Sequence, residues 1–179
     1  MVNILMKYVK LDSGDITIDG KNIEDIDIDK LIGFIGQKNH IYKTDFENNV
    51  TVFGAYDRKN AYECVHTIEN GGITLDSITI SDNCDELSGG EKQLVSFIRN
   101  IAGEYEILIM DEPFSALDRN RLSKVMRVLS ELNNTIIMVT HDISDNLKYF
   151  DCVLQLENGS IVKNSAFCNN VEGVFGRSE

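Results

Sequence analysis

Residues 87–118, LSGGEKQLVSFIRNIAGEYEILIMDEPFSALD, constrain the fold more than any other part of the chain. Ser88 is the predicted N-cap of a helix, because Ser-Gly-Gly stands directly before an apolar pattern of helical period. Gly103 is predicted to end that helix. The apolar positions follow the spacing i, i+3, i+4, i+7 and are Leu94, Phe97, Ile98 and Ile101.

An uninterrupted apolar run, ILIM at residues 107–110, follows this helix. Runs of this kind form strands that are covered on both faces of a parallel sheet. Asp111 and Glu112 come directly after the run, at the end of the strand where open α/β sheets bind their ligands. The stretch therefore predicts a carboxylate pair at a ligand-binding edge.

The order and spacing of these parts resemble the ATP-binding cassette (ABC) ATPase family. Residues 87–91 are similar to the family's signature motif, and residues 107–112 are similar to its Walker B strand with the catalytic glutamate. Residues 115–118, SALD, are similar to its D-loop. Each part alone is a weak signal, since SGG is commonly just a turn. The combination carries the resemblance.

Two further polar residues match the family at the ends of predicted strands. Gln37 follows an apolar strand predicted over residues 31–36 and matches the Q-loop glutamine. His141 follows a buried strand predicted over residues 135–140 and matches the switch histidine. Without the stretch above, each would be interpreted as a structural residue at a strand end.

The resemblance implies a role for each matching residue. Glu112 would polarise the attacking water as general base, and His141 would contact the γ-phosphate. Asp111 and Gln37 would hold Mg²⁺, directly or through water. The implied cofactors are ATP and Mg²⁺. The residues implied to contact ATP or to couple two ATP sites are Gln37, Ser88, Gly89, Gly90 and Asp118.

The implied fold class is α/β, a P-loop-NTPase-like ABC ATPase with a mostly parallel sheet and a helical subdomain. Predicted strands alternate with helices, which favours parallel strands joined by right-handed crossovers. We expect one domain over residues 1–179, with the helical subdomain at 38–100. Further predicted elements are a helix at 1–9, a strand at 15–19, helices at 57–70 and 119–133, and a hairpin at 151–163 turning at Asn158-Gly159.

The phosphate-binding P-loop, GxxxxGK[ST], does not occur in these 179 residues. The resemblance places it immediately before Met1, so we expect an N-terminally truncated domain that has also lost a central strand. P-loop amides and lysine hold the β- and γ-phosphates. We therefore expect that this chain alone is defective in ATP hydrolysis. We also expect one flank of the sheet to be exposed.

Two segments indicate the exporter subtype within the family. In IYKTDFENNV, residues 41–50, Asn49 and Val50 match exporters directly. Asp45 stands where exporters have a threonine, and Asp can N-cap the following short helix as Thr does. In residues 78–86, Asp82 falls at the exporters' acidic position, while Ser81 and Cys84 replace flanking glycines.

Composition excludes some classes of protein. The formal net charge of −12 argues against a nucleic-acid-binding surface, which needs a basic face. The chain has no apolar run of 18 or more residues, so it predicts no transmembrane helix. The cysteines form no CxxC pair, which indicates reduced thiols. The four are Cys64, Cys84, Cys152 and Cys168.

Three functions remain open. The first is the ATPase component of a membrane exporter, cytoplasmic and peripheral on the inner face of the cell membrane. Its partners would be a transmembrane domain and a second ABC ATPase domain, paired head to tail. The second is a non-hydrolysing partner that donates its LSGGE signature to an intact ATPase. The third, a DNA-repair or chromosome-handling ABC protein, is disfavoured. Those proteins carry long coiled coils between Q-loop and signature, whereas only 51 positions (88 − 37) separate Gln37 from Ser88.

Overall fold

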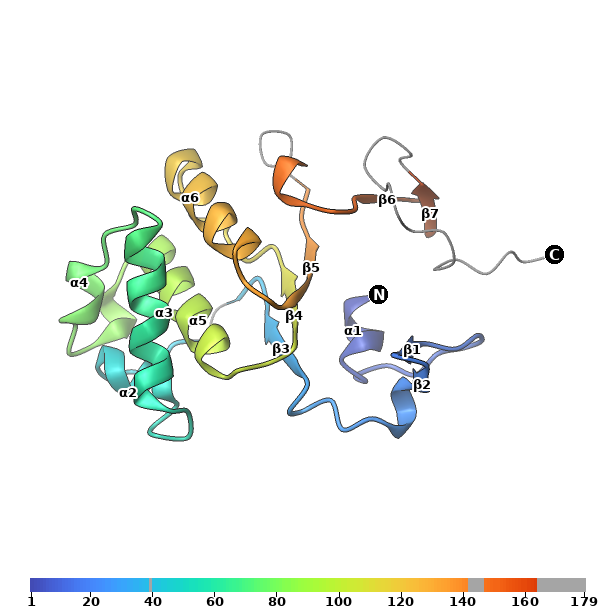
Figure 1. Ribbon diagram of the computed structural model, residues 1–179, viewed down its shortest axis with the longest axis horizontal. Coiled ribbons are helices and arrows are strands. Elements are labelled where there is room, and N and C mark those ends of the chain that lie inside the picture. The colour runs from blue at the N-terminus through green and yellow to red at the C-terminus, as the bar shows by residue number, and fades with distance from the viewer. Residues whose placement is uncertain (39, 142–146, 164–179) are drawn as a thin grey trace. The chain divides into compact units, whose positions relative to one another are not determined.

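The structure is a computed structural model that describes residues 1–38, 40–141 and 147–163. The chain divides into two compact units, residues 1–141 and 142–179, and each is described by itself. The first unit holds a three-stranded sheet, the helices and every residue of the candidate site (Figure 1).

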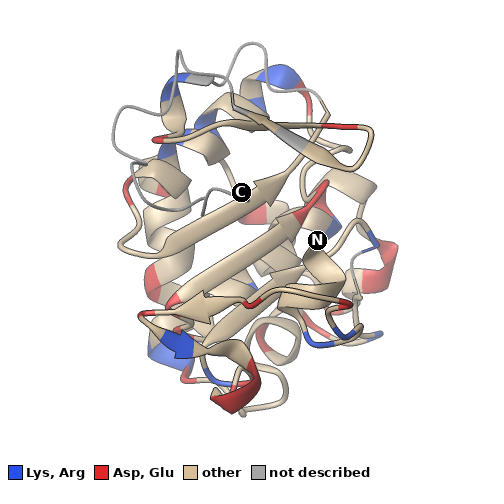
Figure 2. Ribbon diagram, turned by 90° about the vertical axis from the view of Figure 1, so that its right-hand side faces the viewer, with Lys and Arg blue, Asp and Glu red and all other residues tan. Residues whose placement is uncertain are grey.

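The three-stranded sheet is parallel throughout. Its strands, in spatial order, are β3 (Ile32–Ile35), β4 (Ile107–Asp111) and β5 (Thr135–Val139). The register pairs Ile35 with Met110 and Asp111 with Val139. Figure 2 shows the strands uncharged along most of their length, with Asp, Glu, Lys and Arg at their ends and on helices and turns. The predicted α/β class with a mostly parallel sheet is confirmed.

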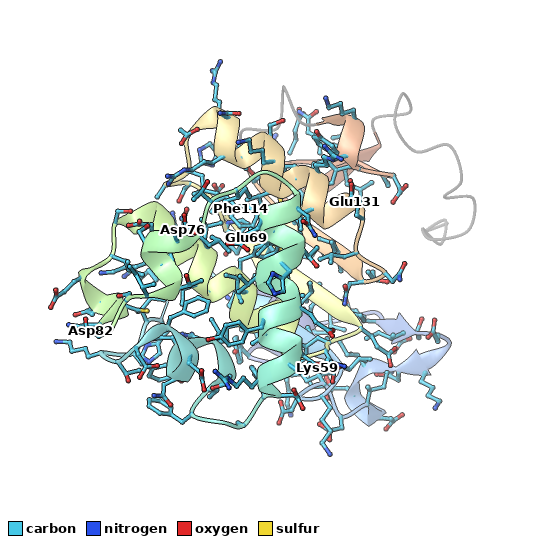
Figure 3. The ribbon with its side chains drawn as sticks, turned by 60° about the vertical axis from the view of Figure 1, so that its left-hand side comes forward. Lys59, Glu69, Asp76, Asp82, Phe114 and Glu131 are labelled. Atoms are coloured by element: carbon cyan, nitrogen blue, oxygen red, sulfur yellow. The ribbon has the colours of Figure 1, made fainter. Side chains whose placement is uncertain are left out.

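Within the described residues, four α-helices come between β3 and β4. They are α2 (Phe46–Thr51), α3 (Arg58–Asn70), α4 (Asp76–Thr79) and α5 (Gly89–Ala102). Asp45 caps α2 through Asn48 N–H at 2.8 Å, as predicted. Asp57 caps α3, whose buried residues are Ala61, Cys64, Val65 and Ile68. In Figure 3, Lys59 and Glu69 mark the two ends of α3.

Helix α5 forms the centre of this helical region. It packs against α2, α3 and β3. Of its predicted apolar face, Leu94, Phe97 and Ile98 are buried, while Ile101 is half-buried. Gly103 is the C-cap, as predicted. The predicted helical subdomain, 38–100, stays a prediction.

The N-terminal segment forms less regular structure than expected. The helix predicted over 1–9 is confined to α1 (Val2–Leu5), because no side chain caps it and Lys7 turns the backbone to φ +55°. Strands β1 (Thr17–Ile18) and β2 (Lys21–Asn22) pair antiparallel. The turn between them is at Asp19-Gly20, with φ +50° and +78°. A 3₁₀ turn, η1 (Ile23–Asp25), follows.

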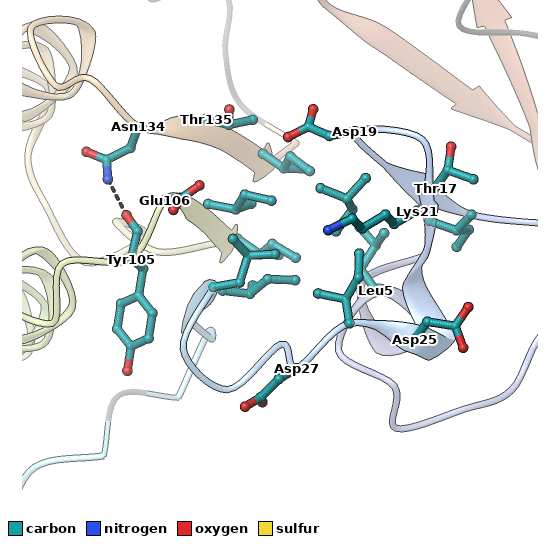
Figure 4. A pocket seen from close by; sticks show the side chains of 18 of the residues that line it. Leu5, Thr17, Asp19, Lys21, Asp25, Asp27, Tyr105, Glu106, Asn134 and Thr135 are labelled. Atoms are coloured by element: carbon teal, nitrogen blue, oxygen red, sulfur yellow. Dashed lines mark hydrogen bonds between the residues drawn. The ribbon is translucent and has the colours of Figure 1, made fainter.

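Strand β5 is in the expected place, but the prediction that it is buried is wrong. None of its five residues is buried, because β4 is its only partner within the described residues. One face of the sheet opens into a cavity of about 1030 Å³. Isoleucines of the sheet and of the N-terminal segment form its apolar floor, and Asp19, Asp25, Asp27 and Glu106 stand around it (Figure 4).

Helix α6 (Arg119–Ser130) lies between β4 and β5 in the sequence. Val125, Met126 and Leu129 are buried, whereas Leu122 and Leu132 are half-buried. The helix ends three residues before the predicted boundary at Asn133, because Glu131 is already its C-cap.

The second unit contains the predicted hairpin. Strands β6 (Leu154–Glu157) and β7 (Ser160–Lys163) pair antiparallel around Asn158 and Gly159, whose φ angles are +49° and +80°. Both positive angles match a type I′ turn, as predicted. A 3₁₀ turn, η3 (Leu147–Tyr149), precedes it. Residues 171–179, for which no element was predicted, lie outside the described residues.

Two sequence expectations concern the chain as a whole. None of the described helices is long and apolar enough to cross a membrane. Cys64 and Cys84 are buried free thiols, and burial raises the pKa of Cys64 to about 11. Cys152 is disulfide-bonded, so the prediction of reduced thiols is wrong for that residue. Cys168 lies outside the described residues.

Candidate functional site

The carboxylate pair stands where the sequence placed it, at the carboxyl end of the central strand. Asp111 is the last residue of β4, and Glu112 follows with φ +50°, a left-handed conformation that a non-glycine residue rarely adopts. Glu112 N–H still donates to Val139 O at 2.9 Å, so the pairing with β5 extends one residue beyond the strand. Pro113 follows and has no N–H to continue the ladder. Strained backbone at such an edge is typical of functional sites.

His141 meets Glu112 across the end of the sheet. Its Nδ1 is in hydrogen-bonding contact with Glu112 Oε1, and the two residues follow neighbouring parallel strands. The carboxylate is the more enclosed partner, with its side chain 19% exposed against 82% for the imidazole. In the tautomer that carries its proton on Nδ1, the imidazole donates to the carboxylate and fixes its direction.

Gln37 lies at the same edge of the sheet. It is the second residue after β3, which pairs in parallel with β4 up to Ile35 and Met110, so it follows the same end of the sheet as Asp111. The side chain of Gln37 is exposed. The structure thus brings four predicted site residues to one edge: Gln37, Asp111, Glu112 and His141.

The signature turn, Ser88-Gly89-Gly90, begins α5 as a capping box. Ser88 Oγ accepts from Glu91 N–H at 3.4 Å, while Glu91 Oε2 accepts from Ser88 N–H at 2.9 Å and from Ser88 Oγ at 2.6 Å. These bonds from the Ser88 hydroxyl and N–H lower the pKa of Glu91. Ser88 as N-cap was predicted; Glu91 was missed, although S-x-x-E is a recognisable capping pattern.

The signature turn packs directly on the D-loop, residues 115–118. A Cβ on Gly90 would lie only 3.1 Å from Ala116 O, so a larger residue there would push the two loops apart. Gln93 is buried and holds the D-loop at two points: its Oε1 accepts from Ala116 N–H at 3.0 Å, and its Nε2 donates to Ser115 Oγ at 3.3 Å. Sequence reasoning missed Gln93, since one amide inside a helix gives no signal alone.

Asp118 has a structural task in this chain. It is the N-cap of α6, and its Oδ1 accepts from Arg121 N–H at 2.9 Å. This backbone bond is the main reason that the pKa of Asp118 is lowered. The side chain is exposed, so a further contact is open to it.

The predicted site residues thus form two sets on different elements. One set lies at the carboxyl ends of β3, β4 and β5, and the other lies at the N-terminus of α5 with the D-loop. Within the described residues, no three His, Cys, Asp or Glu side chains gather as a metal site. Asp111 and Gln37 supply oxygen atoms suited to Mg²⁺ that arrives with phosphate oxygens and water, which is how proteins usually hold this ion.

Comparison with known proteins gives a consistent result. A family model described as ABC transporter matches residues 1–115. An ATP-dependent lipid A-core flippase of Vibrio vulnificus (strain CMCP6) is 27% identical, over 96% of this chain and 31% of the relative. The glycine betaine/carnitine/choline transport ATP-binding protein OpuCA of Bacillus subtilis (strain 168) is 29% identical, over 90% of this chain and 45% of the relative.

Among solved structures, a bacterial Atm1-family ABC exporter with ATP bound matches with a TM-score of 0.73. It is 20% identical, and the match covers 90% of this chain and 30% of that one. This match shows the fold. The chain therefore spans less than half the length of each of these three proteins.

Proposed function

Because the chain belongs to the ABC transporter family, we propose that it is the ATP-binding and ATP-hydrolysing part of an ABC exporter that couples hydrolysis to transport. The observation that carries this proposal is the contact of His141 with Glu112, beside Asp111, at one edge of the parallel sheet. The name of the flippase relative and the exporter-like segment around Asn49 support the direction of transport.

Each residue at the sheet edge has a task that its position suits. Glu112 accepts a proton from the attacking water, and His141 orients that carboxylate and contacts the γ-phosphate. Asp111 and Gln37 provide oxygen ligands for Mg²⁺, which when bound neutralises phosphate charge. The signature turn offers N–H groups at a helix N-terminus to the phosphates of an ATP held by a partner domain.

The same proposal predicts that this chain alone is inactive. Its 179 residues contain no GxxxxGK[ST] loop, so nothing cradles the β- and γ-phosphates beside Asp111 and Glu112. The partners that the proposal requires are a transmembrane domain and a second ABC ATPase domain paired head to tail. The location that follows is the cytoplasmic face of the cell membrane.

A second candidate function is that of a non-hydrolysing partner, which donates its signature turn to an intact ATPase. Ser88 and Gly89 are exposed, so the turn is accessible to another chain. Mixing this chain with an intact ABC ATPase domain tests the idea. Stimulated hydrolysis that Ser88→Arg removes supports donation, while unchanged hydrolysis contradicts it.

Nucleotide binding by the chain alone is the first test of the main proposal. Titration of a fluorescent ATP analogue with Mg²⁺ is expected to show weak or no binding. Micromolar affinity at a single site would contradict the expected inactivity.

Restoring a P-loop segment in frame from an exporter-type relative is the decisive test. Mg²⁺-dependent ATP hydrolysis should then appear, because the carboxylate pair and His141 are already in place. Glu112→Gln should abolish turnover, retain nucleotide and trap an ATP-bound dimer on size exclusion. Glu106→Gln, at an exposed glutamate just before β4, is the matched control and should leave turnover unchanged. Full turnover in Glu112→Gln would show that Glu112 is not the base.

A further inference from the structure

Arg99 connects α5 with the segment that follows Gln37. Its guanidinium donates three hydrogen bonds: Nη1 to His40 O at 2.6 Å, Nε to Asn49 O at 2.7 Å, and Nη2 to Asn49 Oδ1 at 2.9 Å. The Tyr42 ring lies over the guanidinium, 4.9 Å from centroid to Cζ. All these partners belong to residues 40–49, here called the 40–49 segment.

The positive charge of Arg99 is held by uncharged oxygens. Arg99 is half-buried, and burial lowers its pKa. Within the described residues, its hydrogen-bond partners are backbone carbonyls and one amide, not a carboxylate. The guanidinium of an exposed arginine is solvated by water and counterions. Here its planar fork of donors is matched to three fixed acceptors. The role of Arg99 is therefore geometric, and lysine cannot reproduce it.

Asn49 organises the other side of this connection. It is fully buried, and its Oδ1 also accepts from Tyr42 N–H at 2.9 Å. Its Nδ2 donates to the carbonyls of Tyr42, Thr44 and Asp45 at 3.0–3.1 Å. The 40–49 segment is thus folded around one side chain, and Arg99 attaches that folded segment to α5.

We propose that Arg99 is a positioning residue, which makes the 40–49 segment and the signature turn move as one body. Arg99 lies eleven positions (99 − 88) after Ser88 along one continuous helix, a rigid span of about 16 Å. A displacement of the 40–49 segment is therefore carried by α5 to Ser88-Gly89-Gly90. This rests on the proposed function, in which a transmembrane domain is a partner and the signature turn meets ATP.

Hydrogen–deuterium exchange of the 179-residue chain tests the connection without nucleotide. Arg99→Lys keeps the charge and removes most of the fork, so amide exchange in the 40–49 segment and at Glu91 and Lys92 should rise about tenfold. Exchange in β4 should stay unchanged. Arg127→Lys is the matched control, because Arg127 is exposed on α6 and, within the described residues, its side chain bonds only Glu131, at 3.3 Å. This change should alter exchange in neither region.

A second substitution distinguishes a connection through Arg99 from a merely local stabilisation of each region. Tyr42→Leu removes the ring over the guanidinium and its contact with Phe53. In the unsubstituted chain, this change should raise exchange at Glu91 and Lys92. In the Arg99→Lys background, it should still raise exchange in the 40–49 segment but add nothing at Glu91 and Lys92. Additive increments at both places would mean independent destabilisation and would overturn the proposal.

Each outcome decides one idea. Unchanged exchange at Glu91 and Lys92 in Arg99→Lys overturns the connection and leaves the ATPase assignment intact. Failure of the P-loop restoration with the expected exchange pattern leaves the connection and rejects the proposed function. If Arg99→Lys does not fold, Tyr42→Leu alone decides. Unchanged exchange at Glu91 and Lys92 in Tyr42→Leu then overturns the proposal.

Discussion

Helix α5 and strand β5 are both apolar stretches of the first unit, but they are covered to very different degrees. Half of α5 is buried, including every residue from Gln93 to Ile98, whereas no residue of β5 is buried. Helices α2 and α3 and strand β3 surround α5, while β5 has β4 on one side only within the described residues. The apolar pattern of a stretch thus determines that a helix or strand forms. The elements packed around that helix or strand determine how much its burial stabilises the fold.

Polar groups differ between the two regions in the same way. Around α5, the buried side chains of Asn49 and Gln93 have their donors and acceptors occupied by neighbouring loops. Beside β5, Thr135 and Ile137 line the large cavity, with carboxylates around it. We expect the first region to be stable and specific, and the second to be weakly stabilised and prone to association.

The largest effect should come from the core of the helical region. Phe97 is fully buried on α5 and meets Phe114 edge to face at 5.4 Å between ring centroids. Phe97→Ala should lower the free energy of unfolding by about 3–5 kcal/mol, measured by urea denaturation. Phe53→Ala, at a phenylalanine that is 61% exposed, is the matched control and should cost less than about 0.5 kcal/mol. Equal losses would contradict the comparison.

The next effect should come from the polar centre of the same region. Asn49→Ala leaves the Tyr42 N–H and three carbonyls without their side-chain partner, so we expect a loss of about 2–3 kcal/mol. Asn100→Ala, which removes one bond to Ser96 O, serves as control and should cost under about 1 kcal/mol. Similar urea midpoints for the two variants would show that the 40–49 segment is not held by Asn49.

A smaller effect is expected in β5. Ile137 is half-buried, so Ile137→Ala should cost about 1 kcal/mol, against about 2–5 kcal/mol for Ile109→Ala at its paired position in β4. Thermal melts of both variants give the ranking. If Ile137→Ala destabilises as much as Ile109→Ala, then β5 is covered in solution by something outside the described residues, and the contrast with α5 disappears.

The smallest effect concerns pH at the signature turn. Ser88 lowers the pKa of folded Glu91, so this carboxylate adds stability above its unfolded pKa and loses it as pH falls through the folded pKa. Glu91→Gln should therefore flatten the acid side of the stability curve between about pH 5 and pH 3 and leave the slope above pH 6 unchanged. Urea midpoints at several pH values measure this. An unchanged acid slope would mean that the capping box adds no pH dependence.

Local patterns predicted the elements well, and they failed where distant neighbours decide. The caps at Asp45 and Ser88, the turn at Asn158 and the parallel arrangement of the strands follow from nearby residues. The burial of β5 did not follow, because it depends on which elements cover the strand. The length of the first helix was also wrong, because no side chain caps it and Lys7 adopts a positive φ. Among site residues, the edge position of Asp111 and Glu112 was predictable from one strand.

The contacts between loops were not predictable in the same way. Gln93 reaches Ala116 across 23 residues, and Arg99 reaches Asn49 across 50. A single polar residue in an amphipathic helix does not indicate which loop it meets. The family resemblance supplied the roles of His141 and Gln37, and the parallel register then brought them to the same edge.

The capping box gives the signature turn an anion of its own. The Glu91 carboxylate already accepts from the hydroxyl and the N–H of Ser88, which are donors that a phosphate oxygen would seek. An incoming phosphate must displace this carboxylate or share its donors against like-charge repulsion. In the proposed function, where the turn meets a partner's nucleotide, Glu91 would compete with the phosphate for Ser88, and the affinity would be the difference between the binding of two anions at one serine.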